Sequence, residues 1–338
     1  MKTLPLVLLL APLHAEPIDR EALVTRHNPV IEKLDVDAPV SVGNGGFAFT
    51  ADVTGLQTFA KEHHRHGVPT ETQCRWAWFT EPNPENHTLT DASEDYVEAD
   101  GRIVSYATNA GTEAGQWLRR NPRSHPLGQL AFVHADGSPL AVEEVSETRQ
   151  TLDLWRGVIT SKFTFEGEPV EVVTTCHPDH DLIAVRMKSA LFTDGRLVVK
   201  LGFPRGHDAS EKLTPALDWS APETHTTTSQ QDGQRLDFTR TRGDLNYHAA
   251  IMWSGDATTI FPGPHQYLIK PSSESLELSL AFAPGDLPAG LPSFESTLTA
   301  STKHWEAYWR NGAAVDLGSS TDPRATKLEN RIILSLYL

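Results

Sequence analysis

Four Asp-Gly pairs lie between residues 100 and 233 of this 338-residue chain, and they constrain its fold more than any other feature. Each pair lies between alternating or continuous apolar runs, an arrangement typical of a tight turn between two antiparallel strands. No helical period interrupts this pattern from about Val40 to Pro288. We therefore predict a mainly β fold of short antiparallel strands, with turns at Asp100-Gly101, Asp136-Gly137, Asp194-Gly195 and Asp232-Gly233.

The apolar runs near these turns have the usual length of a strand. So many consecutive hairpins favour two large sheets packed face to face, a β-sandwich (supersandwich) larger than an immunoglobulin-like domain. We place this domain at residues 16–290, where a Pro- and Gly-rich stretch marks its end. The runs predicted as strands are Val158 to Phe165, Val170 to Thr175, Leu182 to Lys188, Leu197 to Gly202, Leu236 to Thr241, Tyr247 to Trp253 and Leu276 to Phe282.

Helices are predicted at both ends of the sandwich. A short one is expected between Ile18 and Lys33, broken at His27-Asn28-Pro29. Ser293 can cap a second helix, in a helical linker at residues 291–321, and Asn311-Gly312 can end it. A third helix is expected to begin with Asp322 as N-cap and Pro323 at its first position, and to carry an apolar stripe of Leu328, Ile332, Ile333, Leu336 and Tyr337.

That last stripe has no partner helix behind it in the sequence, and the helix lacks a C-terminal capping Gly. We interpret residues 322–338 as the first helix of a truncated helical domain. The alternative is a terminal helix that docks back on the sandwich.

The first residues predict export. Lys2 begins a short basic region, Leu4 to Leu13 form an apolar run, and Ala15 suits a cleavage position, so residues 1–15 are typical of a signal peptide. No later run is long enough to span a membrane, which indicates a periplasmic or secreted protein and no membrane partner. The chain has 29 Lys and Arg residues against 44 Asp and Glu residues, and a net charge of −15 disfavours a nucleic-acid partner.

The two cysteines, Cys74 and Cys176, would meet an oxidising compartment. A disulfide between them would close a long loop, but sequence separation alone cannot bring two residues together. Two buried, unpaired thiols are the favoured interpretation, and a disulfide is the alternative.

A polar and aromatic stretch between strands offers candidate substrate-binding residues. It follows the Gly43-Asn44-Gly45-Gly46 turn and contains Gln57, Arg75, Trp76 and Trp78. Indole faces stack on sugar rings, whereas amide and guanidinium groups bind hydroxyls, so the mixture suits a carbohydrate site. The alternative is that the two tryptophans only cover an edge of the sandwich.

Other clusters carry less weight. Adjacent histidines point apart in a strand, so His63, His64 and His66 match no metal motif, and we predict neither a metal nor a cofactor. The string from Cys176 to Asp181 is interpreted as a turn. Glycoside hydrolysis needs two facing carboxyls, and the neighbours Glu94-Asp95 and Glu143-Glu144 do not face one another on a strand. We therefore predict no catalytic residue within this sequence.

The order of these parts resembles the front of the six-hairpin glycosidases, and in particular family 65 of the glycoside hydrolases, which includes maltose and kojibiose phosphorylases. The stretches that carry the resemblance are the Gly-Asn-Gly strand from Val42 to Phe49, Trp305-Glu306-Ala307-Tyr308-Trp309, Asp322-Pro323-Arg324 and Leu334 to Leu338.

The resemblance implies a sandwich followed by an (α/α)6 barrel that carries the catalytic residues. It also implies that sandwich loops approach the mouth of the barrel. The phosphorylases usually continue the Gly-Asn-Gly strand into Arg-Gly, whereas this chain reads Phe49-Thr50-Ala51-Asp52, which favours hydrolysis over phosphorolysis.

Three hypotheses about function follow. The leading one is the non-catalytic N-terminal portion of a secreted, inverting glycoside hydrolase that acts on oligosaccharides. Its partners would be the carbohydrate substrate and the missing C-terminal helical barrel, and this portion alone should be inactive. The second is a stand-alone, lectin-like carbohydrate-binding protein. The third is a purely structural envelope protein.

Overall fold

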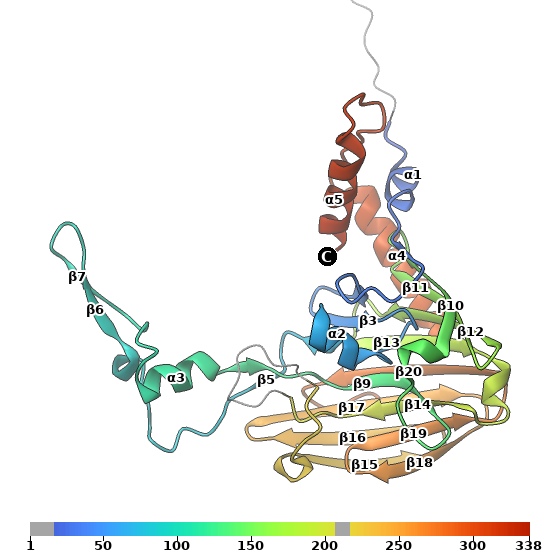
Figure 1. Ribbon diagram of the computed structural model, residues 1–338, viewed down its shortest axis with the longest axis horizontal. Coiled ribbons are helices and arrows are strands. Elements are labelled where there is room, and N and C mark those ends of the chain that lie inside the picture. The colour runs from blue at the N-terminus through green and yellow to red at the C-terminus, as the bar shows by residue number, and fades with distance from the viewer. Residues whose placement is uncertain (1–16, 207–216) are drawn as a thin grey trace, which may run out of the picture.

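The computed structural model describes residues 17–206 and 217–338, so the signal-peptide prediction lies outside the described residues. Its largest element is a nine-stranded antiparallel sheet (Figure 1). In order across the sheet, the strands are β1 (Val30–Ile31), β10 (Val145–Asp153), β11 (Val158–Phe165), β12 (Glu168–Cys176), β13 (Leu182–Lys188), β20 (Ser275–Ala283), β17 (Leu245–Ser254), β16 (Arg235–Arg242) and β15 (Thr226–Asp232).

Two smaller sheets face this large one. Phe132 on β9 lies against Phe163 on β11 with ring centroids 5.9 Å apart, and Phe47 on β3 lies 6.1 Å from Phe282 on β20. The hydrophobic core therefore lies between the layers, which confirms the predicted β-sandwich. One small sheet holds β18 (Ala257–Gly263), β19 (Gln266–Pro271), β14 (Leu197–Gly202) and β9 (Gln129–His134), and the other holds β2 (Val40–Gly43), β3 (Phe47–Ala51) and β4 (Thr72–Cys74).

The predicted strands all form, and β11, β13 and β14 have the predicted bounds. Asp100-Gly101 and Asp232-Gly233 join paired strands as expected. The hairpin predictions for Asp136-Gly137 and Asp194-Gly195 are wrong, because each pair lies between strands of different sheets, β9 and β10 for the first and β13 and β14 for the second. Around Asp136-Gly137 the chain forms only an isolated antiparallel bridge between Val133 and Pro139. The glycine of each Asp-Gly pair has a positive φ, so the motif identified the turn but not the strand that follows it.

Helices lie outside the sandwich. The N-terminal residue of α4 (Phe294–Asn311), Phe294, packs with Leu182 and Ala184 on the outer face of the large sheet. α5 (Ala325–Tyr337) returns beside α4, and α1 (Arg20–Thr25) lies on the other side (Figure 1). Among the described residues, no helix is both long and apolar enough to cross a membrane. Single 3-10 turns are η2 (Val142–Glu144), η3 (Ala190–Phe192) and η4 (Pro222–Thr224).

Three details differ from the helix predictions. α2 (Ala60–His66) and α3 (Glu113–Arg120) lie where no helix was expected, because helices of seven or eight residues are too short to display a clear period. The histidine run is thus helical, and His63 is fully buried with its Nδ1 3.1 Å from the Val68 carbonyl. α5 begins at Ala325, because Asp322 instead binds the backbone N–H and guanidinium of Arg324.

Residues 80–122 form an excursion that we call the arm. It lies between β5 (Trp78–Phe79) and β8 (Arg123–Ser124) and contains η1 (Thr90–Ala92), β6 (Glu94–Val97), β7 (Ile103–Tyr106) and α3. Figure 1 shows the β6–β7 ribbon projecting far from the sandwich.

Both cysteines are buried and unbonded, which confirms the favoured interpretation. Cys74 is on β4 and Cys176 ends β12. Burial raises the pKa of the Cys74 thiol to about 11 and also raises that of Cys176, so neither is a reactive thiolate near neutral pH.

Candidate functional site

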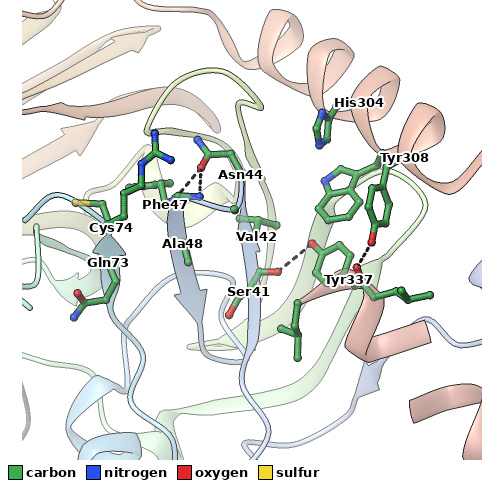
Figure 2. Close-up of a pocket in the computed structure, with 17 residues that line it drawn as sticks. Ser41, Val42, Asn44, Phe47, Ala48, Gln73, Cys74, His304, Tyr308 and Tyr337 are labelled. Atoms are coloured by element: carbon green, nitrogen blue, oxygen red, sulfur yellow. Dashed lines mark hydrogen bonds between the residues drawn. The ribbon is translucent and has the colours of Figure 1, made fainter. Parts of the chain in front are cut away.

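A hollow lies where the sandwich meets the C-terminal helices. Its volume is about 650 Å³, and it is lined by the β2–β3 turn, by Arg75, and by residues of α4 and α5. Figure 2 shows Asn44 on one side of this hollow and His304 and Tyr308 on the other. Segments far apart in the sequence therefore build it together.

The β2–β3 turn is held by the Asn44 side chain. Asn44 Oδ1 accepts hydrogen bonds from the backbone N–H groups of Gly46 and Phe47, at 3.0 and 2.8 Å. Its Nδ2 donates to the His180 carbonyl at 3.1 Å and to the Asp181 carboxylate at 3.3 Å. Gly45 takes a left-handed φ of 83°, a conformation in which a residue with a Cβ would meet a steric penalty. The Gly-Asn-Gly-Gly sequence thus forms a rigid rim for the hollow.

The opposite wall is aromatic. The Trp305 ring on α4 stacks on Tyr337 of α5 with centroids 4.4 Å apart and planes 24° apart. Tyr308 O–H donates to the Leu336 carbonyl at 2.6 Å, and Tyr337 O–H donates to the Ser41 carbonyl at 3.1 Å. These bonds fix the ring edges and leave part of the Trp305 and Tyr308 surfaces facing the hollow. Such rigid aromatic faces suit stacking on sugar rings.

A buried carboxylate attaches α5 to the N-terminal segment. Glu329 Oε1 lies 2.5 Å from His27 Nε2 and 2.9 Å from Arg26 Nε, and Oε2 accepts from the Leu317 N–H at 2.5 Å. Burial opposes the charge, but the bonds from His27, Leu317 and Arg26 hold the pKa of Glu329 below its ordinary value. This carboxylate is saturated with donors, so its role is to position α5.

The apolar stripe of α5 is divided between two faces. Ile333 and Tyr337 are buried against the preceding elements, as in the docking alternative. Leu328 and Leu336 remain exposed, and Ile332 is half-buried. One face therefore docks, and the other offers an apolar strip to solvent.

The predicted binding residues fall in different places. Arg75 lines the hollow, and its guanidinium lies across Gly46. Trp76 lines a neighbouring hollow of about 340 Å³, where its indole N–H donates to Asp181 at 2.7 Å. Trp78 is 49% exposed and its indole N–H donates to the Arg75 carbonyl at 2.8 Å. The structure thus brings Arg75, Trp76 and Trp78 to one edge, and their substrate-binding role stays a prediction.

Gln57 lies elsewhere. Its side chain is fully buried, donates to the Thr50 carbonyl and to Thr72 Oγ1 at 3.2 Å each, and accepts from the Leu130 N–H at 3.3 Å. Gln57 therefore joins β3, β4 and β9 inside the core. Its long polar side chain suggested a binding role in the sequence, but pattern alone does not reveal which way such a side chain points.

Asn44, His304, Trp305 and Tyr308 line the hollow but were not among the predicted site residues. The first lies in the Gly-rich turn and the others in the Trp- and Tyr-rich helix that carried the family resemblance, which was the available signal. No described residue lining the hollow is Asp or Glu, so these residues do not supply the carboxyl pair that glycoside hydrolysis uses.

Comparison with solved structures identifies the fold. The chain superposes with a TM-score of 0.55 on a structure titled "Putative kojibiose phosphorylase from human microbiome", at 8% sequence identity. The alignment covers 92% of this chain and 41% of that protein, so this chain spans less than half of that protein's length. No protein-family model and no curated protein matches the sequence. This structural similarity confirms, at the level of the fold, the resemblance that was noted in the sequence.

Proposed function

We propose that this chain is the non-catalytic N-terminal portion of a secreted glycoside hydrolase that acts on oligosaccharides. The observation that carries the proposal is the fold likeness, which extends over nearly all of this chain and only 41% of the similar protein. The exposed apolar strip of α5 supports it, because Leu328 and Leu336 would be covered by a following helical domain.

In this proposal the hollow forms one wall of the sugar-binding pocket. Trp305 and Tyr308 provide stacking surfaces, Arg75 and His304 provide hydrogen-bonding groups beside them, and Asn44 holds the shape of the rim. The general acid and the residue that activates water would lie on the helical barrel. An inverting outcome follows from the resemblance to family 65.

Hydrolysis is preferred to phosphorolysis because of the strand that follows the Gly-rich turn. This chain reads Phe49-Thr50-Ala51-Asp52 where the phosphorylases usually continue into Arg-Gly, and Asp52, directly after β3, is 1% exposed. Its carboxylate accepts from the Thr54 and Phe59 N–H groups at 2.8 and 2.5 Å. These residues stabilise the sandwich and offer no cation for a phosphate ion.

The test is to express both the 338-residue chain and the protein encoded by the complete reading frame. Hydrolysis of a panel of α-linked disaccharides is measured by sugar release, and the anomer formed first is identified by NMR. We expect activity with inversion from the longer protein and none from this chain. Activity of the 338-residue chain that disappears on one carboxylate substitution would contradict the proposal.

A second candidate is carbohydrate binding by this chain alone. The exposed indole of Trp78 beside Arg75 favours it, because both groups face solvent at the edge of the hollow. Calorimetric titration with oligosaccharides would give a saturable signal that Trp78→Ala removes. A flat titration for the wild-type chain would contradict this second candidate.

A further inference from the structure

The residues from His177 to Asp181 join the paired strands β12 and β13, where the sequence predicted a turn. Backbone hydrogen bonds fix both ends of this segment. The His177 N–H donates to the Leu182 carbonyl, and the Phe282 N–H on β20 donates to the Asp181 carbonyl, each at 2.9 Å. The side chain of Asp181 therefore starts from a fixed position directly before β13.

The two carboxylate oxygens of Asp181 accept hydrogen bonds from different parts of the chain. Oδ1 accepts from Asn44 Nδ2 at 3.3 Å, and Oδ2 accepts from Trp76 Nε1 at 2.7 Å. These two donors are 137 and 105 positions away from Asp181 in the sequence. Asn44 lines the hollow of about 650 Å³, and Trp76 lines the neighbouring hollow of about 340 Å³. One half-buried carboxylate thus bridges the walls of both hollows.

Each side of this bridge leads to groups that the proposed function assigns to sugar binding. On one side Asn44 holds the β2–β3 turn, where the Gly46 carbonyl accepts from the Arg75 N–H at 2.8 Å. On the other side the bridge reaches the Trp76 indole directly. A change at Asp181 would therefore disturb the rim and the indole together.

We propose that Asp181 is a positioning residue for sugar binding, which keeps the Asn44 rim and the Trp76 indole in one fixed arrangement. This role rests on the proposed function. Two N–H donors need two acceptor atoms, which a carboxylate supplies, whereas an amide of the same size would place an NH₂ group against one of the donors. The negative charge also strengthens both hydrogen bonds.

The first test follows the bridge itself by NMR of protein that contains isotope-labelled tryptophan. The chain has eight Trp residues, and the indole N–H signal that is lost in Trp76→Phe belongs to Trp76. Asp181→Asn should move this signal upfield, because the indole loses its charged acceptor. It should also speed hydrogen exchange at the Gly46 and Phe47 amides, because their acceptor in the rim loses an anchor.

Asp179→Asn is the matched control, because it removes an exposed carboxylate from the same turn, and it should change neither readout. Asparagine has the size of aspartate and position 181 is half-buried, so Asp181→Asn should fold. An unchanged Trp76 signal and unchanged exchange in Asp181→Asn would overturn the proposal.

The second test measures sugar release by the protein that the complete reading frame encodes. Asp181→Asn should raise KM about tenfold and keep kcat within about a factor of two, because it weakens sugar binding equally in the ground and transition states. Asp179→Asn should change neither constant. An unchanged KM in Asp181→Asn would overturn the positioning role and leave the proposed function standing. A wild-type protein that neither binds nor hydrolyses sugars would instead overturn the proposed function, and this role with it.

Discussion

The imidazole of His27 and the carboxylate of Glu329 are 302 positions apart in the sequence, and His27 Nε2 lies 2.5 Å from Glu329 Oε1. Both side chains are almost completely buried. Arg26 and the Leu317 N–H complete the set of donors around this carboxylate. The segment after α1 thereby holds α5 against the sandwich, and α5 in turn supplies Tyr337 to the aromatic wall.

Glu329→Gln should lower the free energy of unfolding by about 2–3 kcal/mol, because it removes the charge that three donors share in a buried site. Urea denaturation monitored by tryptophan fluorescence would measure the change. Glu21→Gln on α1 is the matched control, and we expect its effect to be within about 0.5 kcal/mol. Equal effects of the two substitutions would show that the cluster does not stabilise the fold.

Gly157→Ala should be much more harmful than Gly167→Ala, although both glycines have positive φ values of 67° and 79°. A Cβ at position 157 would lie 2.1 Å from Trp305 Nε1, whereas a Cβ at position 167 would meet nothing within 4 Å. Gly167→Ala should cost about 1 kcal/mol for its backbone conformation, and Gly157→Ala about 1–3 kcal/mol more for the displaced indole. Thermal unfolding measures both, and similar melting temperatures would mean that Trp305 is not packed on Gly157.

Gln57→Ala and Arg75→Ala should separate stability from sugar binding. Gln57→Ala removes three buried hydrogen bonds and should lower the unfolding free energy by about 2–3 kcal/mol. Arg75→Ala should change it by less than about 0.5 kcal/mol, because the Arg75 side chain is exposed, but should weaken sugar binding or raise KM in the complete enzyme. Denaturation curves and sugar-release kinetics on both variants check this, and a stable Gln57→Ala protein with impaired binding would assign Gln57 to the substrate instead.

Protonation of His225 should make the fold sensitive to acid. Burial, followed by the nearby positive charge of Arg240, lowers the pKa of His225 to about 3. Arg240 Nη2 donates to its Nδ1 at 2.8 Å, and the His265 ring is stacked on it at 3.8 Å. The unfolded chain takes up a proton below the ordinary pKa of 6.5 and the folded chain does not, so stability falls as pH decreases from 6.5 towards 3.

His225→Gln should keep an acceptor for Arg240 and remove this part of the pH dependence. The wild type should then lose about 1–2 kcal/mol more than the variant between pH 7 and pH 5. His66→Gln, at an exposed position of α2, is the control and should leave the slope unchanged. Denaturation at several pH values measures the difference, and parallel curves for wild type and His225→Gln would contradict the assignment.

Predictions from the sequence were correct where residues close together in the chain decide the local structure. Alternation from Val158 to Phe165 predicted β11 with its bounds, because one face of that strand is buried and the other is not. Ser293 was predicted to cap α4, and its hydroxyl accepts from the Ser296 N–H at 3.2 Å. The Asp-Gly pairs predicted turns, since glycine reaches positive φ without a steric penalty.

Only the tertiary structure decided where the polar side chains point and which segments meet. Gln57 and Arg75 are equally polar in the sequence, yet the sheets enclose the first and leave the second at the rim of the hollow. Asn44 and Tyr308 come together across the chain because α4 and α5 fold back over the β2–β3 turn. The sequence by itself determined the main strands, the Asp-Gly turns and the Ser293 cap, since these depend on backbone conformation and on contacts within a few residues. The hollow is built by segments that are far apart in the sequence and meet only when the layers of the fold pack together. Which segments meet depends on the burial and hydrogen bonding of the whole chain, and no local sequence pattern encodes it.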